Sequence, residues 1–155
     1  GRQIEVLEFG GSHSRSSIAY LDKKYGILFS GDEMESGQVL MQGNFRGGEN
    51  CVERYKENLL HLLTYRDQFD TICPPHNGSP MDASIIDAFI ENCDRIMSGI
   101  EGEKDIGSIS YLLGPNEPRS PESVKELRYD PTARRSEWKG TSIVYSTDRI
   151  FKNTI

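Results

Sequence analysis

The first thirty residues alternate between apolar and polar side chains in short runs, which is typical of β-strands with one face against a core. Residues 3–9 predict a first strand, and Gly10-Gly11-Ser12 predicts the turn after it. Residues 17–21 predict a second strand and residues 27–29 a third, joined by a hairpin loop over 22–26. The opening of the chain is therefore predicted to consist of strands and turns.

Two later segments show the 3.6-residue spacing of amphipathic helices. One apolar face of the first helix is formed by Val52, Tyr55, Leu59, Leu62 and Leu63. The stripe of the second consists of Ile85, Ile86, Phe89, Ile90, Cys93, Ile96 and Met97. We predict that the second helix begins with Ser79 as its N-cap and Pro80 at its first helical position, and that it ends at Gly99.

Short apolar runs at 71–73 and 142–145 predict two further strands, whereas 109–113 is compatible with a strand or a short helix. Residues 33–50 resemble a loop, and residues 114–140 carry four prolines, which predicts a functional loop, a lid or a mobile connector. The order of elements favours an α/β layered domain, in which a mixed β-sheet has helices packed on one face.

A length of 155 residues is that of one domain, so residues 1–155 are expected to fold as a single unit. The formal net charge of −6 disfavours nonspecific binding to nucleic acid or to an anionic membrane surface. No apolar run is long enough to span a bilayer, and we expect no membrane role.

Three widely spaced cysteines form neither a disulfide framework nor a zinc knuckle, which favours a reducing, cytoplasmic location. Cys93 is predicted to lie on the apolar face of its helix, and Cys73 at the end of a strand. The chain begins with Gly1, almost directly before its first strand, and we expect it to be a fragment of a longer protein.

Three polar residues directly follow predicted strands: His13, Asp32 and His76. Groups at the carboxyl ends of neighbouring strands converge where open α/β sheets bind ligands. Imidazole nitrogen and carboxylate oxygen, without thiolate, suit Zn²⁺, Fe or Mn²⁺. The alternative is that glycine- and proline-rich turns attract His and Asp without forming a site. His61 lies opposite the apolar face of its helix and is expected to point into water.

The order and context of these residues resemble the metallo-β-lactamase-fold hydrolases. That family shows P-G-H-T/S-x-x-S after a strand, then a hairpin and a strand ending in S/T-G-D, and later P-G-H-x-x-P. The corresponding segments here are Ser12-His13-Ser14-Arg15-Ser16-Ser17, Ser30-Gly31-Asp32 and Pro74-Pro75-His76-Asn77-Gly78-Ser79-Pro80. The resemblance covers residues 3–100, and the strand at 142–145 also fits.

The resemblance implies half of an αββα sandwich, namely the C-terminal portion of the domain. It implies that His13 is a ligand of a first metal ion, that Asp32 bridges two ions and is the catalytic residue of this chain, and that His76 completes the second. The metal would be zinc, with iron or manganese as alternatives. A metal-activated water would attack an ester, thioester, amide or phosphoester in a small-molecule substrate.

Two departures from the family pattern limit this inference. The H-x-H-x-D-H motif, which supplies the principal ligands and precedes the other motifs, is missing from this chain, so the metal site is incomplete here. Ser12 and Pro75 replace glycines before the ligand histidines, and Pro75 is expected to reshape its loop because it restricts φ. We therefore expect weak metal binding and no hydrolase activity from this chain alone.

Two loops could shape specificity. Met34, Met41 and Phe45 could line an apolar pocket or simply pin the 33–50 loop to the core. Arg134, Arg135 and Trp138 could form a lid or an anion clamp, or belong to a solvated connector.

Three hypotheses remain open. The first is the C-terminal part of a cytoplasmic metal-dependent hydrolase, whose missing N-terminal half would be its partner. The second is a non-catalytic binding or self-association module that retains the half-fold. A weaker third is a diiron oxidoreductase on the same fold. In either of the first two cases an isolated half would expose an apolar sheet face, so we expect a homo-oligomer.

Overall fold

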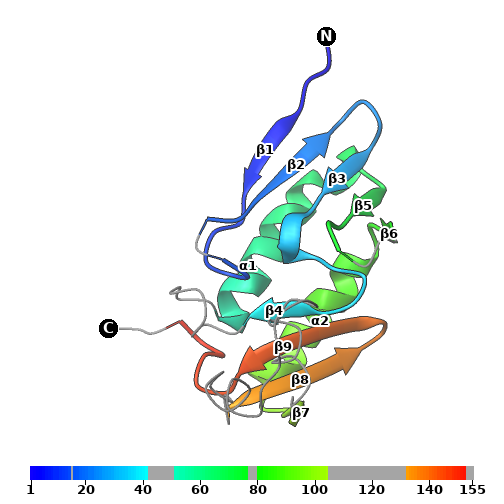
Figure 1. Ribbon diagram of the computed structural model, residues 1–155. Coiled ribbons are helices and arrows are strands. Elements are labelled where there is room, and N and C mark those ends of the chain that lie inside the picture. The colour runs from blue at the N-terminus through cyan, green and yellow to red at the C-terminus, as the bar shows by residue number, and fades with distance from the viewer. Residues whose placement is uncertain (15, 42–50, 77–79, 105–131, 153–155) are drawn as a thin grey trace, which may run out of the picture.

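Two mixed β-sheets lie in front of two α-helices in this computed structural model, which describes residues 1–14, 16–41, 51–76, 80–104 and 132–152 (Figure 1). The first sheet has the order β1-β2-β3-β5-β6, and the second has the order β4-β9-β8-β7. The elements are β1 (Glu5–Glu8), β2 (Ile18–Asp22), β3 (Ile27–Phe29), β4 (Val39–Met41), α1 (Val52–Leu62), β5 (Thr71–Cys73), β6 (Met81–Asp82), α2 (Ile85–Met97), β7 (Glu103–Lys104), β8 (Ala133–Trp138) and β9 (Thr141–Ser146), with 3₁₀ turns at Gly31–Glu33 and Leu63–Gln68.

Strand direction in the first sheet brings three strand ends to one edge. β1 and β2 pair antiparallel, as do β2 and β3, whereas β3 and β5 pair parallel. β1, β3 and β5 therefore run in the same direction, and their carboxyl ends share one edge of the sheet. The predicted strands at 3–9, 17–21, 27–29 and 71–73 are confirmed to within two residues.

One face of this sheet and the two helices enclose the core. The inward positions Leu7, Leu21, Leu28 and Ile72 are buried, and so are the helix positions Val52, Tyr55, Leu59, Leu62, Phe89, Cys93 and Ile96. This confirms the predicted apolar faces of both helices and the arrangement with helices on one face. The opposite face of the sheet has no helix over it in Figure 1, and Val6, Ile18, Tyr20 and Phe29 are exposed there.

The second helix starts later than the sequence pattern predicts. Met81 and Asp82 form strand β6 beside β5, and α2 begins at Ile85 with Ser84 as its N-cap. Pro80 therefore precedes a strand, and Ser79 lies outside the described residues. The predicted end holds, since α2 stops at Met97 and Gly99 adopts a positive φ of 89°. No helix in the described ranges is long and apolar enough to cross a membrane.

The segments interpreted as loops contain two strands of the second sheet. Within 33–50, β4 pairs with β9, and Met34 and Met41 are buried in the core, so these two side chains pin the segment. Phe45 lies outside the described residues. Within 114–140, the last part forms β8, which corrects the prediction of a loop or lid there. The 109–113 segment and residues 105–131 as a whole are not among those described.

Strand β8 escaped prediction because its inward residues are small or polar. Ala133 and Ser136 are buried, and Ser136 Oγ donates to Asn92 Oδ1 of α2. Asn92 Nδ2 in turn donates to Thr141 Oγ1 at 2.9 Å. A buried polar network therefore replaces the apolar pattern that identifies other strands.

The β8 side chains that could have formed an anion clamp are engaged with neighbouring elements. Trp138 Nε1 donates to Glu91 at 2.8 Å, and Arg134 pairs with Glu101. The guanidinium of Arg95 also lies 3.9 Å from the centre of the Trp138 ring. These contacts attach the second sheet to α2 and to the segment that precedes β7.

Two adjacent leucines of α1 differ in burial, so their substitution tests which face of the helix lies in the core. Leu59 is fully buried, whereas Leu60 is 46% exposed. Leu59→Ala is expected to lower the free energy of unfolding by about 2–5 kcal/mol, since it leaves a cavity. Leu60→Ala is expected to change that free energy by less than about 0.5 kcal/mol. Chemical denaturation followed by circular dichroism measures both, and equal losses would contradict the burial described here.

Candidate metal centre

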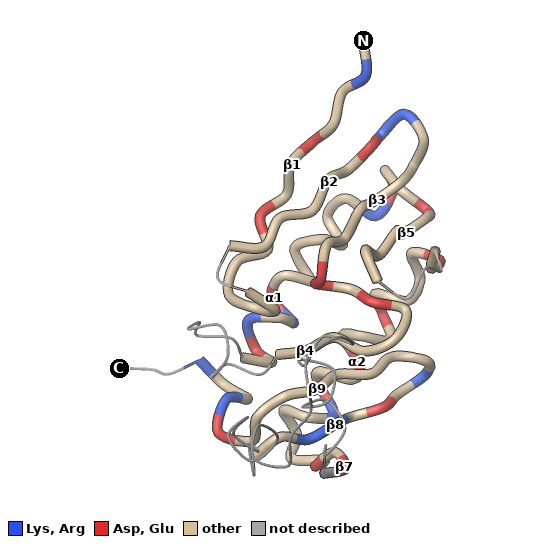
Figure 2. Tube along the Cα trace, viewed as in Figure 1, with Lys and Arg blue, Asp and Glu red and all other residues tan. Residues whose placement is uncertain are grey.

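The loops that follow β1, β3 and β5 place His13, Asp32 and His76 at the shared edge of the first sheet. Asp32 sits in the 3₁₀ turn after β3, directly behind Gly31, whose φ is +57°. A Cβ at position 31 would lie 3.1 Å from the Ile18 carbonyl oxygen, so the turn requires glycine. The acidic positions that follow β3 are visible along the trace in Figure 2.

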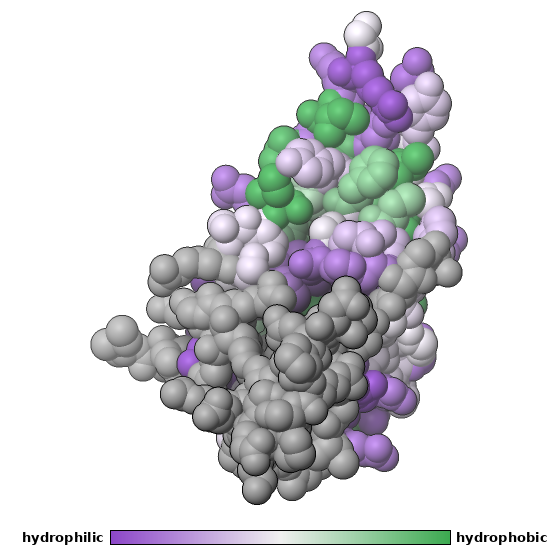
Figure 3. All heavy atoms as spheres, in the orientation of Figure 1, coloured by the Kyte–Doolittle hydropathy of each residue, from purple (hydrophilic) through white to green (hydrophobic). Residues whose placement is uncertain are grey.

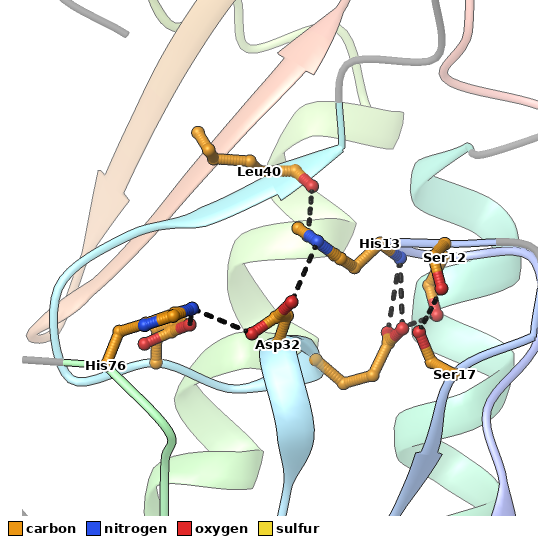
Figure 4. A network of polar contacts seen from close by, with 9 residues as sticks. Ser12, His13, Ser17, Asp32, Leu40 and His76 are labelled. Carbon is orange, nitrogen blue, oxygen red and sulfur yellow. Dashed lines mark hydrogen bonds and ion pairs between the residues drawn. The ribbon is translucent and has the colours of Figure 1, made fainter. Parts of the chain in front are cut away.

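The carboxylate of Asp32 lies between the two histidines (Figure 4). Asp32 Oδ2 is 3.3 Å from His13 Nε2, and Asp32 Oδ1 is 3.1 Å from His76 Nε2. Each oxygen of one carboxylate therefore faces a different imidazole. The convergence predicted from the sequence is present in the structure, while the role of these residues as metal ligands stays a prediction.

Strand β4 orients the ring of His13. His13 Nδ1 lies 2.8 Å from the carbonyl oxygen of Leu40. A carbonyl oxygen only accepts, so Nδ1 carries the proton and donates it. In the neutral ring this leaves the lone pair on Nε2, directed at Asp32. A histidine that binds a metal is held in this way, with its second nitrogen donating to a fixed acceptor.

The loop that carries His13 is held by the buried carboxylate of Glu33. Ser12 Oγ donates to Glu33 Oε2, and the backbone N–H of His13 lies 3.2 and 3.3 Å from the two oxygens. Burial raises the pKa of Glu33 above its ordinary value, and hydrogen bonds from Ser12, from Ser17 and from backbone N–H groups lower it. Asn58 Nδ2 of α1 donates to Ser12 Oγ at 2.9 Å. The His13 loop is thus joined to both β3 and α1.

Two hydrogen bonds, one of them from a buried tyrosine of the core, hold the turn that follows β3. Tyr55 is fully buried on α1, and its hydroxyl donates to the carbonyl oxygen of Glu33 at 2.7 Å. Ser30 Oγ donates to the carbonyl oxygen of Met34 at 2.9 Å and closes the turn from the other side. Asp32 therefore projects from a turn whose backbone groups are bonded to a helix and to the turn itself.

Glu35 is a further acidic residue at this centre, and sequence reasoning missed it. Its side chain is only 5% exposed, and Oε1 lies 3.9 Å from His76 Nε2. Its other oxygen, Oε2, is buried and has no hydrogen-bond partner among the described residues. Burial raises the pKa of Glu35, the charge of Asp32 adds to the rise, and His76 opposes it. Asp32, Glu35 and His76 each offer a ligand atom, and these atoms lie within 4.8 Å of one another.

The remaining predicted positions differ in their surroundings. His76 reaches Asp32 from an exposed loop, since 63% of its side chain is accessible. His61 is exposed on α1, as predicted, and its ring contacts Tyr65 edge to face. The sequence did contain a signal for the missed carboxylates. Three acidic residues fall within four positions after a strand, namely Asp32, Glu33 and Glu35.

The contribution of Glu33 can be measured with the variant Glu33→Gln. An amide retains one acceptor oxygen but turns an NH₂ group toward the donors of Ser12 and His13. The free energy of unfolding is expected to fall by about 1–3 kcal/mol, with faster hydrogen exchange at the His13 amide. Glu137→Gln, on an exposed position of β8, is the matched control. Unchanged exchange at His13 in the Glu33 variant would contradict the positioning role.

No protein-family model matches the sequence, and no curated protein matches it. Among solved structures, DIM-1 metallo-β-lactamase is 20% identical with a TM-score of 0.45, over 57% of this chain and 40% of that chain. The metallo-β-lactamase FIM-1 from Pseudomonas aeruginosa, in its mono-zinc form, is 18% identical with a TM-score of 0.45, over 57% of this chain and 38% of that chain. A structure of TMB-1 is 15% identical with a TM-score of 0.47, over 61% and 42%.

The chain spans about 40% of the length of the first of these structures. Likenesses at this level of identity and TM-score carry no argument about activity, so the proposals below rest on the site itself. The described residues form a mixed α/β fold with two helices and two mixed sheets, and part of the chain is similar to the metallo-β-lactamases named above.

Proposed function

We propose that this chain contributes His13, Asp32 and His76 to the metal centre of a metal-dependent hydrolase. The observation that carries the proposal is the carboxylate of Asp32, whose oxygens lie 3.3 and 3.1 Å from the Nε2 atoms of two different histidines. A neutral imidazole nitrogen and a carboxylate oxygen both present lone pairs. Their close approach is stabilised only when a proton or a cation lies between them.

The donor set is suited to a divalent transition metal. Ligand atoms bonded at about 2.1 Å to one tetrahedral ion lie about 3.4 Å apart, close to the separations found around Asp32. His13 is held by Leu40 in the tautomer that leaves Nε2 available. Nitrogen and oxygen donors without thiolate favour zinc, with iron and manganese as alternatives. The residues present therefore fit the metal that the sequence resemblance implies.

The expected chemistry is hydrolysis of an ester, thioester, amide or phosphoester in a small-molecule substrate. A bound divalent ion lowers the pKa of its water, so that hydroxide is available near neutral pH. In this chain Asp32 would hold a metal ion together with the histidines, while Leu40 orients His13 and Glu33 holds the His13 loop. The remaining ligands would come from a partner layer that carries H-x-H-x-D-H, which this chain lacks.

Activity is expected to need a longer protein that carries that motif. The 155-residue chain should not hydrolyse p-nitrophenyl esters or bis(p-nitrophenyl) phosphate measurably with Zn²⁺, Mn²⁺ or Fe²⁺ present. In the longer protein, Asp32→Ala or His76→Ala should lower kcat by at least about 100-fold, whereas His61→Ala should have little effect. Robust turnover by the 155-residue chain, or full activity of the Asp32 variant, would contradict the proposal.

A second candidate function is self-association through the open face of the first sheet. The register places Val6, Tyr20, Phe29 and Cys73 in one row across four strands. Ile18 lies on the same face, and it is exposed, as are Val6, Tyr20 and Phe29. Figure 3 shows this apolar surface over the upper part of the molecule. Such a row favours pairing with a second copy or with another layer of the same domain.

Self-association predicts a dimer or higher oligomer for the isolated chain. Light scattering at tens of micromolar should give at least twice the monomer mass, and Tyr20→Lys should return the chain to a monomer because it places a charge in the row. Leu60→Lys, which charges an exposed apolar position on α1, is the control and should leave the oligomer intact. A monomeric wild-type chain would rule out this candidate.

A further inference from the structure

We infer that Glu35 is a metal ligand, and that with Asp32 and His76 it forms a three-ligand site for one divalent cation lying entirely within this chain. The inference rests on the proposed metal function for Asp32 and His76 and adds a residue to it. It also changes the expected behaviour of the isolated chain. A scheme that divides His13, Asp32 and His76 between two ions gives each ion two ligands, whereas Glu35 supplies a third to the ion at His76.

The geometry of the three side chains supports a single ion. His76 Nε2 lies 3.1 Å from Asp32 Oδ1 and 3.9 Å from Glu35 Oε1. One ligand atom of each residue lies within 4.8 Å of the other two. Ligand atoms bonded at about 2.1 Å to a common ion lie about 3–3.5 Å apart, so the separations among these three would shorten by roughly 2 Å at most. Much of that shift can come from His76, because its loop is exposed.

Burial of Glu35 is the independent observation that points to a ligand. Only 5% of the Glu35 side chain is exposed, yet Oε2 has no hydrogen-bond partner among the described residues. A buried carboxylate oxygen without a donor is costly, and the negative Asp32 beside it adds to that cost. Glu33, two residues earlier, is equally buried but accepts hydrogen bonds from Ser12 and His13. Glu33 is therefore satisfied by the protein, whereas Glu35 receives a hydrogen bond from the backbone of His76 and its Oε2 has no donor among the described residues.

The donor set indicates which cations the site prefers. Two carboxylates and one imidazole are harder ligands than a set of histidines, and they suit Mn²⁺, Fe²⁺ and Zn²⁺. A divalent ion would also neutralise the two negative charges of Asp32 and Glu35. The second oxygen of Glu35 would then be placed to bind the same ion or to accept from a water bound to it.

Manganese titration of the 155-residue chain tests this site without using activity. Free Mn²⁺ has a six-line electron paramagnetic resonance signal that is lost on binding, so the signal counts bound ions. We expect one ion per wild-type chain and a Kd at least about 10-fold higher for Glu35→Gln. His61→Ala should change the Kd by less than about 2-fold, because His61 is exposed on α1 and is not in the site. Glu137→Gln controls for the loss of one surface charge.

Thermal unfolding separates loss of a ligand from loss of the fold. Without metal, Glu35→Gln should unfold at the wild-type temperature or above it, since it removes a buried charge. Added Mn²⁺ should raise the Tm of the wild type but not that of Glu35→Gln, because only the metal-binding form gains stability.

Each contrary result has a distinct meaning. Equal Mn²⁺ affinity in wild type and Glu35→Gln, with binding lost in His76→Ala, would overturn the role of Glu35 and leave the proposed metal function standing. An affinity that falls with His61→Ala as much as with Glu35→Gln would place the ion elsewhere and overturn the three-ligand site. Absence of Mn²⁺ binding by the wild-type chain would also overturn it, whereas the proposed function is tested separately by hydrolysis in the longer protein.

Discussion

The buried carboxylate of Glu33 links the loop after β1 to the turn after β3. The carboxylate accepts hydrogen bonds from the hydroxyl of Ser12 and the backbone N–H of His13. The backbone carbonyl oxygen of Glu33 accepts a further hydrogen bond from the hydroxyl of Tyr55 in the core. This link spans two loops that are 20 residues apart in the sequence. It helps to set the distance from His13 to Asp32, because the backbone of His13 bonds to the Glu33 carboxylate and Asp32 directly precedes Glu33 in the chain.

The acidic run after β3 shows how surroundings assign different roles to similar side chains. Glu33 is buried and bonded to several donors, so it acts as a structural acceptor. Asp32 is 36% exposed and faces a histidine with each oxygen. Glu35 is buried, and one of its oxygens has no hydrogen-bond partner in the part of the chain that the structure describes. Three carboxylates within four residues therefore divide into a group that positions a loop, a group that lies between two histidines and a buried group beside His76.

The sequence was informative where local pattern and local chemistry coincide. Alternation predicted β1, β2 and β3, and helical spacing predicted the buried faces of α1 and α2. His13, Asp32 and His76 could be found because each follows a strand and strands β1, β3 and β5 share a direction. The replacement of a glycine by Ser12 looked like a departure, and the structure shows that its hydroxyl pairs with Glu33.

Features that depend on long-range contacts could not be predicted in the same way. The acceptor for His13 is a backbone carbonyl of Leu40, and any residue type could supply it. Strand β8 was missed because Ser136 is satisfied by Asn92, 44 residues away. The burial of Glu35 results from tertiary packing, which a glutamate after a turn does not reveal. Local sequence thus predicted the ligand positions, and only the fold revealed what orients and neutralises them.

The central proposal is that Asp32 holds a divalent cation beside His76. Anomalous diffraction detects such a bound ion directly. Crystals of the 155-residue chain grown with Zn²⁺ would be measured above and below the zinc absorption edge. The account predicts one strong difference peak about 2.0–2.2 Å from a carboxylate oxygen of Asp32 and from Nε2 of His76. A fully ordered Asp32 and His76 without such a peak, with zinc only at exposed positions such as His61, would contradict it.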